Sequence, residues 1–196
     1  MLVIYIHGFL SSPLSLKAQQ TNEFCQQQIP NVQFSCPALS AYPHQAISVL
    51  GNLVEQNADK RIGLIGSSLG GYYATYLSEK YQLPAVVVNP AVKPYQLMTS
   101  YLDQDLKNYH TDEVSRLNNS HVQQLRDLEV DSLQYPHNFW LLAQTGDETL
   151  NYKHAVKRYQ ACKMTIEEGG DHSFQNFERW LPDIFSFFNS RLETSL

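Results

Sequence analysis

A serine flanked by glycines is the feature of this chain with the most evident chemistry. Residues 63–71 read Gly-Leu-Ile-Gly-Ser-Ser-Leu-Gly-Gly and contain the spacing G-x-S-x-G, with Ser68 at its centre. In this pattern the serine occupies a sharp turn between a strand and a helix, where its hydroxyl can attack a carbonyl carbon. Because the backbone is strained there, the residues two before and two after must be very small, as Gly66 and Gly70 are. Such a short pattern also occurs by chance, so its meaning depends on the rest of the chain.

A serine nucleophile needs a base, and His172 is the histidine best placed to be one. A neutral imidazole, with a reference pKa of about 6.5, accepts a proton readily near neutral pH. In enzymes with this serine turn, the histidine follows the last strand. His172 follows an expected strand at 163–167 and the pair Gly169-Gly170, which lets the loop turn back towards Ser68. The other histidines precede the serine, lie in or beside an insertion, or lie on an expected helix: His7, His44, His110, His121, His137 and His154.

The third residue of such a site is a carboxylate that accepts a hydrogen bond from the histidine ring and stabilises the imidazolium. Asp147 is the leading candidate, because it follows an expected strand and the turn residue Gly146. Glu148 is adjacent but should point elsewhere, and Asp171 is badly placed to reach around the ring of its neighbour His172. Two further acids, Asp103 and Asp105, fall inside the insertion.

Two backbone N–H groups are expected to stabilise the oxyanion that forms during acyl transfer. The residue after the nucleophile, Leu69, provides one of them. The turn after the first strand provides the other, from Phe9 or, as the alternative, from Leu10. We expect His7 to stabilise this turn and not to bind a metal, because no second ligand stands at a suitable spacing from it.

The elements that must position these residues alternate along the chain. Short β-rich apolar segments alternate with helix-length stretches, which is typical of a parallel sheet covered by helices on both faces. Strands are expected at 2–6, 32–35, 61–65, 85–88, 138–143 and 163–167. Helices are expected at 14–28, 44–56, 68–80 and 152–161, followed by a C-terminal segment with an aromatic face whose main helical part starts near Pro182.

The connection between the fourth and fifth strands, residues 90–136, is much longer than one crossover helix requires. A short helix is expected at 95–101, and a more polar one at 113–128 that turns inward Val114, Leu117, Val122, Leu125 and Leu128. An insertion here lies near the carboxyl ends of the strands, where ligands bind, so we expect a cap or lid. An additional packing layer is the alternative. Three tyrosines of the insertion are candidates for an acyl pocket or for packing: Tyr95, Tyr101 and Tyr109.

Size and charge exclude several classes of protein. The chain has 196 residues, of which 43% are hydrophobic, and this predicts a single domain over residues 1–196. A net charge of −5 argues against nucleic-acid binding, which relies on a basic surface. The longest apolar runs, 2–6 and 83–88, are too short to cross a bilayer, and the N-terminus lacks the pattern of a secretion signal. We therefore expect a cytoplasmic protein.

The three cysteines do not form a recognisable motif. They lack the close spacing of a zinc or redox site. We expect buried thiols at Cys25, Cys36 and Cys162.

Together, these segments resemble the α/β-hydrolase superfamily and, within it, the small bacterial YqiA-type esterases. The resemblance extends over nearly the whole chain, is weakest between about residues 100 and 135, and is carried by residues 5–9, 11–13, 66–75, 83–91, 144–148, 169–172 and Phe174. It implies a three-layer α/β-hydrolase fold with a mainly parallel sheet of about six strands, which lacks the first two strands of the usual eight.

The same resemblance implies a serine esterase without cofactor or metal, which hydrolyses small-molecule, short-chain acyl esters through an acyl-Ser68 intermediate. Ser68, Asp147 and His172 correspond to the family's catalytic triad. Acyl-thioester hydrolysis, acyl transfer, peptide hydrolysis and a catalytically silent binding protein remain open alternatives. The oligomeric state is not indicated by the sequence.

Overall fold

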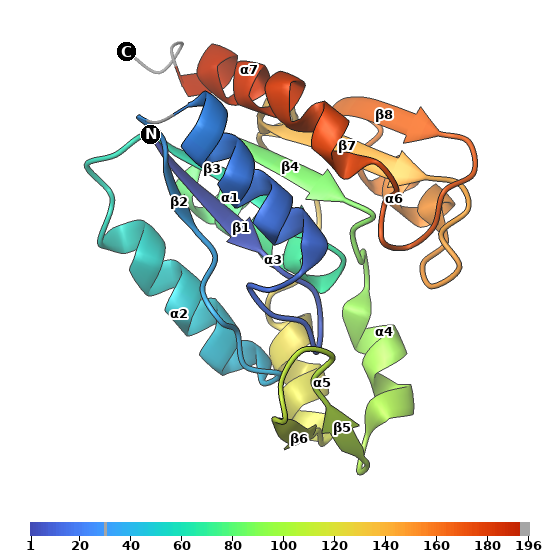
Figure 1. Ribbon diagram of the computed structural model, residues 1–196. Helices are drawn as coiled ribbons and strands as arrows, with labels where there is room; N and C mark the ends of the chain where they lie inside the picture. Colours follow the sequence, from blue (N-terminus) through green and yellow to red (C-terminus); the bar gives the residue numbers. More distant parts are fainter. Residues whose placement is uncertain (30, 193–196) are drawn as a thin grey trace.

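A six-stranded parallel sheet with helices on both faces forms the centre of the molecule (Figure 1). The computed structural model describes residues 1–29 and 31–192, so Pro30 and residues 193–196 of the expected domain lie outside the described residues. The strands are β1 (Leu2–Ile6), β2 (Gln33–Ser35), β3 (Ile62–Ser67), β4 (Ala85–Val88), β7 (Phe139–Gln144) and β8 (Lys163–Glu167). Their order is β2-β1-β3-β4-β7-β8, and every neighbouring pair is parallel. The predicted α/β class is confirmed.

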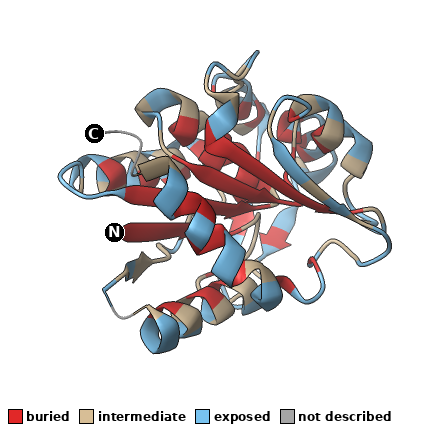
Figure 2. Ribbon diagram, turned by 90° about the horizontal axis from the view of Figure 1, so that it is seen from above, coloured by how far each residue is buried: buried red, intermediate tan, exposed pale blue. Residues whose placement is uncertain are grey.

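Burial on both faces explains why the sequences of the four central strands are largely apolar. Every residue of β1, β3, β4 and β7 is buried, because helices cover both faces of these strands. Figure 2 shows this buried sheet between helices whose outer surfaces are exposed. The strands at the two edges, β2 and β8, are only partly buried.

Two apolar cores lie on opposite faces of the sheet. One face is covered by α1 (Leu16–Gln28) and α7 (Leu181–Leu192), and the other by α2 (Pro43–Glu55), α3 (Leu69–Tyr81) and α6 (Tyr152–Arg158). The C-terminal aromatic face is confirmed, with its members buried or half-buried: Phe174, Phe177, Trp180, Leu181, Ile184, Phe185 and Phe188. The short 3-10 helix η3 (Phe177–Trp180) leads into α7, and Pro182 lies in the first turn of that helix. The other expected strands and helices of the sheet domain are observed, with ends that differ by up to three residues.

The insertion contains a structure that the sequence pattern did not predict. Its elements are α4 (Pro94–Met98), η1 (Thr99–Tyr101), β5 (Asp105–Lys107), β6 (Val114–Arg116), α5 (Asn119–Arg126) and η2 (Pro136–Asn138). Figure 1 shows α4, β5, β6 and α5 gathered beneath the sheet. The short helix expected at 95–101 is observed as α4 followed by η1.

The prediction of a helix at 113–128 is wrong for the first part of that range. Residues 114–116 pair antiparallel with β5, and only the middle residue, Ser115, is buried. The helix begins later because the Asn118 side chain accepts the Ser120 N–H, while the His121 ring accepts the Asn118 N–H. Val114, expected to face inward, is 57% exposed; the other expected inward residues are buried: Leu117, Val122, Leu125 and Leu128.

Contacts to α2 and to the loop after β1 are among those that hold the insertion on the rest of the molecule. The ring of His121 on α5 lies 4.8 Å from the ring of Tyr42, which precedes α2. At the loop after β1, Tyr109 N–H donates to the carbonyl of Leu10 at 2.8 Å. The insertion is therefore fixed to both α2 and the β1–α1 loop.

The cysteines are thiols in a largely apolar setting. Cys25 is buried as expected, whereas Cys36 and Cys162 are half-buried, and all three are free. Burial raises the pKa of Cys25 to about 11, of Cys36 to about 12 and of Cys162 to about 11.

Within residues 1–29 and 31–192, no helix has both the length and the apolar character that a membrane crossing requires.

Candidate active site

Ser68 occupies a strained turn between β3 and α3. Its φ of 56° and ψ of −121° place it in a region that residues with a side chain rarely adopt, at a cost of about 1–3 kcal/mol. A Cβ atom at Gly66 would lie 2.3 Å from the Gly70 carbonyl oxygen, and one at Gly70 would lie 1.9 Å from the Ile6 carbonyl oxygen. The expected need for minimal residues at both positions is confirmed.

The structure brings the three residues of the expected triad into one chain of hydrogen bonds. The Ser68 Oγ lies 3.0 Å from His172 Nε2. On the other side of the ring, Nδ1 lies 2.9 Å from each carboxylate oxygen of Asp147. The Asp147 side chain is 2% exposed and that of His172 is 24% exposed, so the acid is shielded while the base is accessible. These distances allow a proton to pass from the serine hydroxyl to the imidazole.

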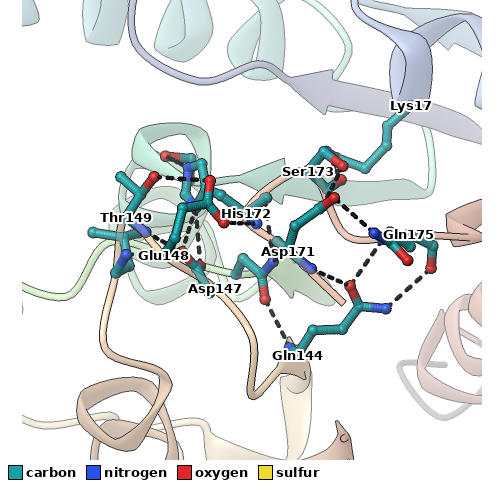
Figure 3. A network of polar contacts seen from close by, with 12 residues as sticks. Lys17, Gln144, Asp147, Glu148, Thr149, Asp171, His172, Ser173 and Gln175 are labelled. Carbon is teal, nitrogen blue, oxygen red and sulfur yellow. Dashed lines mark hydrogen bonds and ion pairs between the residues drawn. The ribbon is translucent and has the colours of Figure 1, made fainter. Parts of the chain in front are cut away.

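Hydrogen bonds within the loop after β7 explain why Asp147, and not Glu148, faces the ring of His172. One oxygen of Asp147 accepts the N–H groups of Thr149 at 2.9 Å and Leu150 at 2.8 Å, which fixes the carboxylate (Figure 3). Glu148 instead accepts the backbone N–H of His172 at 3.0 Å. Both acids therefore contact the histidine, but only Asp147 contacts its ring.

The remaining acid candidates lie elsewhere. Asp171 accepts hydrogen bonds from the Ser173 hydroxyl and the Gln175 side chain, which lower the pKa of its carboxyl group in that order. Asp105 is on β5 in the insertion, 3.9 Å from Arg116. Asp103 is also in the insertion, between η1 and β5.

The loop that carries His172, residues 169–175, is held by two buried side-chain amides, which sequence reasoning did not identify. Asn89, at the end of β4, donates from its side chain to the carbonyls of Asp171 at 2.9 Å and His172 at 3.2 Å. Gln144, at the end of β7, accepts the N–H groups of Asp171 at 3.2 Å and Gln175 at 2.8 Å (Figure 3). The two amides are also joined, because the Gln144 N–H donates to the Asn89 side chain at 3.0 Å. The sequence does contain one signal for these two residues, because each is a side-chain amide at the end of a buried apolar strand.

The glycines of this loop are required by its geometry. Gly169 and Gly170 have φ values of 76° and 72°, in the left-handed region. A Cβ atom at Gly170 would lie 2.0 Å from the side-chain oxygen of Gln144. The loop therefore packs closely on the amide that holds it.

Lys17, on the first turn of α1, is a third residue that the sequence did not indicate. Its ammonium group donates to the carbonyl of Ser173, next to the histidine (Figure 3). Burial lowers its pKa to about 8, although the charges of Asp171 and Asp147 act in the opposite direction.

The turn after β1 lies directly against the serine. A Cβ atom at Gly8 would be 3.7 Å from Ser68 Oγ. The next residue, Phe9, packs edge to face on Tyr101 of the insertion, with ring centroids 5.7 Å apart. Leu69 is the first residue of α3, so its N–H is at the positive end of that helix.

Of the other two candidate tyrosines in the insertion, Tyr95 is buried and donates its hydroxyl to Glu129, whereas Tyr109 is 74% exposed. Tyr101 is thus the candidate tyrosine whose ring contacts the expected oxyanion turn, whereas Tyr109 contacts that turn through its backbone N–H.

His7 has the position expected for a residue that stabilises the turn. It is buried, and burial is the main reason that its pKa is lowered. Its Nε2 accepts the N–H of Leu39 at 3.1 Å, so Nδ1 carries the proton and donates to the carbonyl of Gly8 at 3.0 Å. No cluster of three or more potential metal ligands, His7 included, is found in the part of the chain that the structure describes.

One protein family matches nearly the whole chain. The profile of UPF0227, described as an uncharacterised protein family, matches residues 2–189. The chain belongs to the UPF0227 family. A UPF0227 relative, the protein YcfP of Escherichia coli (strain K12 / DH10B), is 22% identical over 188 residues, which cover 95% of this chain and 98% of YcfP.

Solved structures show which fold this UPF0227 protein has. Est1E from Butyrivibrio proteoclasticus is 14% identical with a TM-score of 0.75, over 98% of this chain and 88% of Est1E. Alpha/beta hydrolase domain-containing protein 10 from mouse is 16% identical with a TM-score of 0.68, over 98% and 88% of the two chains. The esterase domain of a Rhodothermus marinus protein is 12% identical with a TM-score of 0.67, over 98% and 86%. The expected α/β-hydrolase fold is confirmed.

Proposed function

We propose that this protein is a serine hydrolase that cleaves short-chain acyl esters through an acyl-Ser68 intermediate. The observation that carries the proposal is the unbroken hydrogen-bond chain from Ser68 Oγ through His172 to Asp147. The burial of Asp147 and the accessibility of His172 support the same roles.

The proposed reaction has two steps. His172 Nε2 accepts the Ser68 proton as Oγ attacks the ester carbonyl, and the N–H groups of Phe9 and Leu69 stabilise the oxyanion. His172 then protonates the leaving alcohol. In the second step the imidazole deprotonates a water molecule, which attacks the acyl-serine and releases the acid. Asp147 holds the ring in the required tautomer and stabilises its charge in both steps.

Ester hydrolysis is favoured over the alternatives by the character of the structural neighbours. One neighbour is described as an esterase domain, and another, Est1E, has been solved with ferulic acid bound. Acyl-thioester hydrolysis uses the same triad and is the second candidate. A silent binding protein would have no need for the strained backbone at Ser68, with its φ of 56°.

Replacement of the serine tests the proposal. Ser68→Ala is expected to lower kcat with 4-nitrophenyl butyrate by about 10⁴-fold or more, because the nucleophile is lost. Circular dichroism and the melting temperature check that the variant is folded. The matched control is Ser67→Ala, which alters the adjacent buried serine and should keep most of the activity. Retained turnover in folded Ser68→Ala would refute the assignment.

A further inference from the structure

A groove of about 840 Å³ lies beside the candidate active site, between the insertion and α6. Its size is within the range of roughly 300–1,000 Å³ that holds small-molecule ligands. Lys93 and Leu97 line it from the insertion, and Lys157 and Arg158 line it from α6. We call it the basic groove, for reasons of charge given below.

The walls of the basic groove include the segments that hold the proposed triad. Thr149 and Leu150 line the groove, and their N–H groups are the ones that fix the Asp147 carboxylate. On the other side, Pro90 lines the groove, and the N–H of the next residue, Ala91, donates to the Ser68 carbonyl at 3.0 Å. The groove therefore adjoins the backbone segments that carry Ser68 and Asp147, so an ester long enough to extend past these segments from Ser68 would reach it.

The charge of the basic groove differs in sign from that of the whole chain. Three full cations, Lys93, Lys157 and Arg158, and one carboxylate, Asp131, line it, although the chain carries a net charge of −5. Glu129 lies 3.8 Å from the ammonium group of Lys93 and offsets that charge. The guanidinium of Arg158 donates to the backbone carbonyl of Asp131 at 2.7 Å, which leaves its charge without a carboxylate partner among the described residues.

Lys157 is the cation most available to a ligand. It is exposed on α6, and no ion pair of its ammonium group exists within the described part of the chain. The groove also has an apolar component from the side chains of Val92, Leu97, Leu133, Pro136, Leu150 and Ala161. An occupant that fits both features has an apolar body and an anionic group.

We propose that the basic groove binds an anionic part of the substrate, so that the preferred esters carry a carboxylate or phosphate group away from the scissile bond. This inference rests on the proposed function of Ser68, Asp147 and His172. Carboxylate and phosphate are both anions whose oxygens accept hydrogen bonds from exposed Lys and Arg side chains. The groove then selects among esters, while the triad acts on all of them.

Two matched pairs of esters test this selection. 4-Nitrophenyl hexanoate and mono-4-nitrophenyl adipate differ by a carboxylate on the acyl side, and phenyl butyrate and 4-carboxyphenyl butyrate differ by a carboxylate on the leaving group. The protein should prefer the anionic member of at least one pair. Lys157→Gln should lower the ratio of kcat/KM for the anionic over the neutral member by about fivefold, and Lys157→Glu by more. The preference should also weaken at high salt.

Lys60→Glu is the control for net charge. Lys60 is exposed in the turn before β3, at the amino end of that strand, whereas the groove is lined by segments that follow the carboxyl ends of β4 and β7. This variant changes the charge of the protein as much as Lys157→Glu does. It should leave the ratio unchanged. A ratio that responds equally to both variants would overturn the inference.

Binding to the Ser68→Ala protein separates the groove from catalysis. Calorimetry should show that hexanoate and hexyl phosphate bind more weakly to the double variant Ser68→Ala/Lys157→Glu than to Ser68→Ala. The ligand that binds Ser68→Ala more tightly identifies the preferred anion. If neutral esters are hydrolysed but charge at residue 157 affects neither the ratio nor binding, the groove inference fails alone. If no ester is hydrolysed while binding depends on Lys157, the proposed function fails and the anion site stands.

Discussion

The choice between two adjacent acids is decided by the direction of their side chains. Asp147 contacts the ring of His172, and Glu148 contacts its backbone N–H. A carboxylate on the ring stabilises the imidazolium that forms when the serine loses its proton, whereas a carboxylate on the backbone can only hold the loop.

Asp147→Asn is expected to lower kcat with 4-nitrophenyl butyrate by about 10⁴-fold, because an amide neither holds the tautomer nor stabilises the charged ring. Glu148→Gln is the matched control and should cost far less, since an amide oxygen still accepts the His172 N–H. Equal losses in the two variants would contradict the assignment of the acid.

Lys17 introduces a dependence of stability on pH. Burial lowers its pKa to about 8 in the folded protein from 10.5 in the reference state. Between these values the unfolded chain binds more protons than the folded one, so this residue makes the free energy of unfolding rise with pH.

Lys17→Met should remove this contribution. Urea unfolding of the parent and the variant is compared at the two ends of the pH range, from about 8 to 10.5. The free energy of unfolding of the parent minus that of the variant should increase as pH rises. Taking this difference removes the opposing effect of buried tyrosines such as Tyr73, whose pKa is raised by burial. A difference that is constant with pH would show that Lys17 titrates normally.

At the scale of elements, the position of His172, the proposed base, depends on residues at the ends of β4 and β7. Asn89 and Gln144 are 3% exposed each and together hold the backbone of residues 171–175. Loss of one amide would leave buried N–H or carbonyl groups without partners, each at a cost of about 1–3 kcal/mol.

Gln144→Met keeps the length of the side chain and removes its hydrogen bonds to Asp171 and Gln175. We expect kcat to fall about tenfold to a hundredfold with KM nearly unchanged, because the ring of His172 is displaced while the binding surface is kept. The free energy of unfolding should fall by about 2 kcal/mol. Gln26→Met, on the exposed side of α1, is the control. A loss of stability with unchanged kcat would show that Gln144 supports the fold but does not position the base.

Which elements could be predicted from the sequence follows from their periodicity. The strands β1, β4 and β8 were predicted with their observed bounds, since their residues form short apolar or β-rich runs with clear ends. The strand β6 could not be predicted, because Val114, Ser115 and Arg116 have no apolar alternation and continue into a helical spacing. The strand is stabilised by its partner β5, which is close in space and has an equally weak sequence pattern.

The site shows the same division. Ser68, Asp147 and His172, the proposed triad, could be singled out from their order along the chain, because the carboxyl ends of the parallel strands β3, β7 and β8 lie on the same side of the sheet. Asn89 and Lys17 could not, since one hydrogen-bonds to backbone atoms 82 and 83 residues away and the other to backbone atoms 156 residues away. Contacts of this kind follow from the packed structure and leave no local pattern.

At the scale of the whole molecule, both apolar cores pack on one sheet, so we propose that the chain is a single domain. The insertion joins this unit through α2 and through the β1–α1 loop that carries Phe9. We propose that it acts as a cap whose position is fixed by these contacts. The same arrangement makes one wall of the basic groove from the insertion and the other from α6.

Reaction with a fluorophosphonate tests most directly whether Ser68 is a nucleophile. The folded protein should gain the mass of one phosphonyl group, and peptide mapping should place that group on Ser68. Ser68→Ala and His172→Gln should not react, because the first lacks the nucleophile and the second lacks its base. A folded protein that does not react, or that carries the label on another residue, would contradict the account.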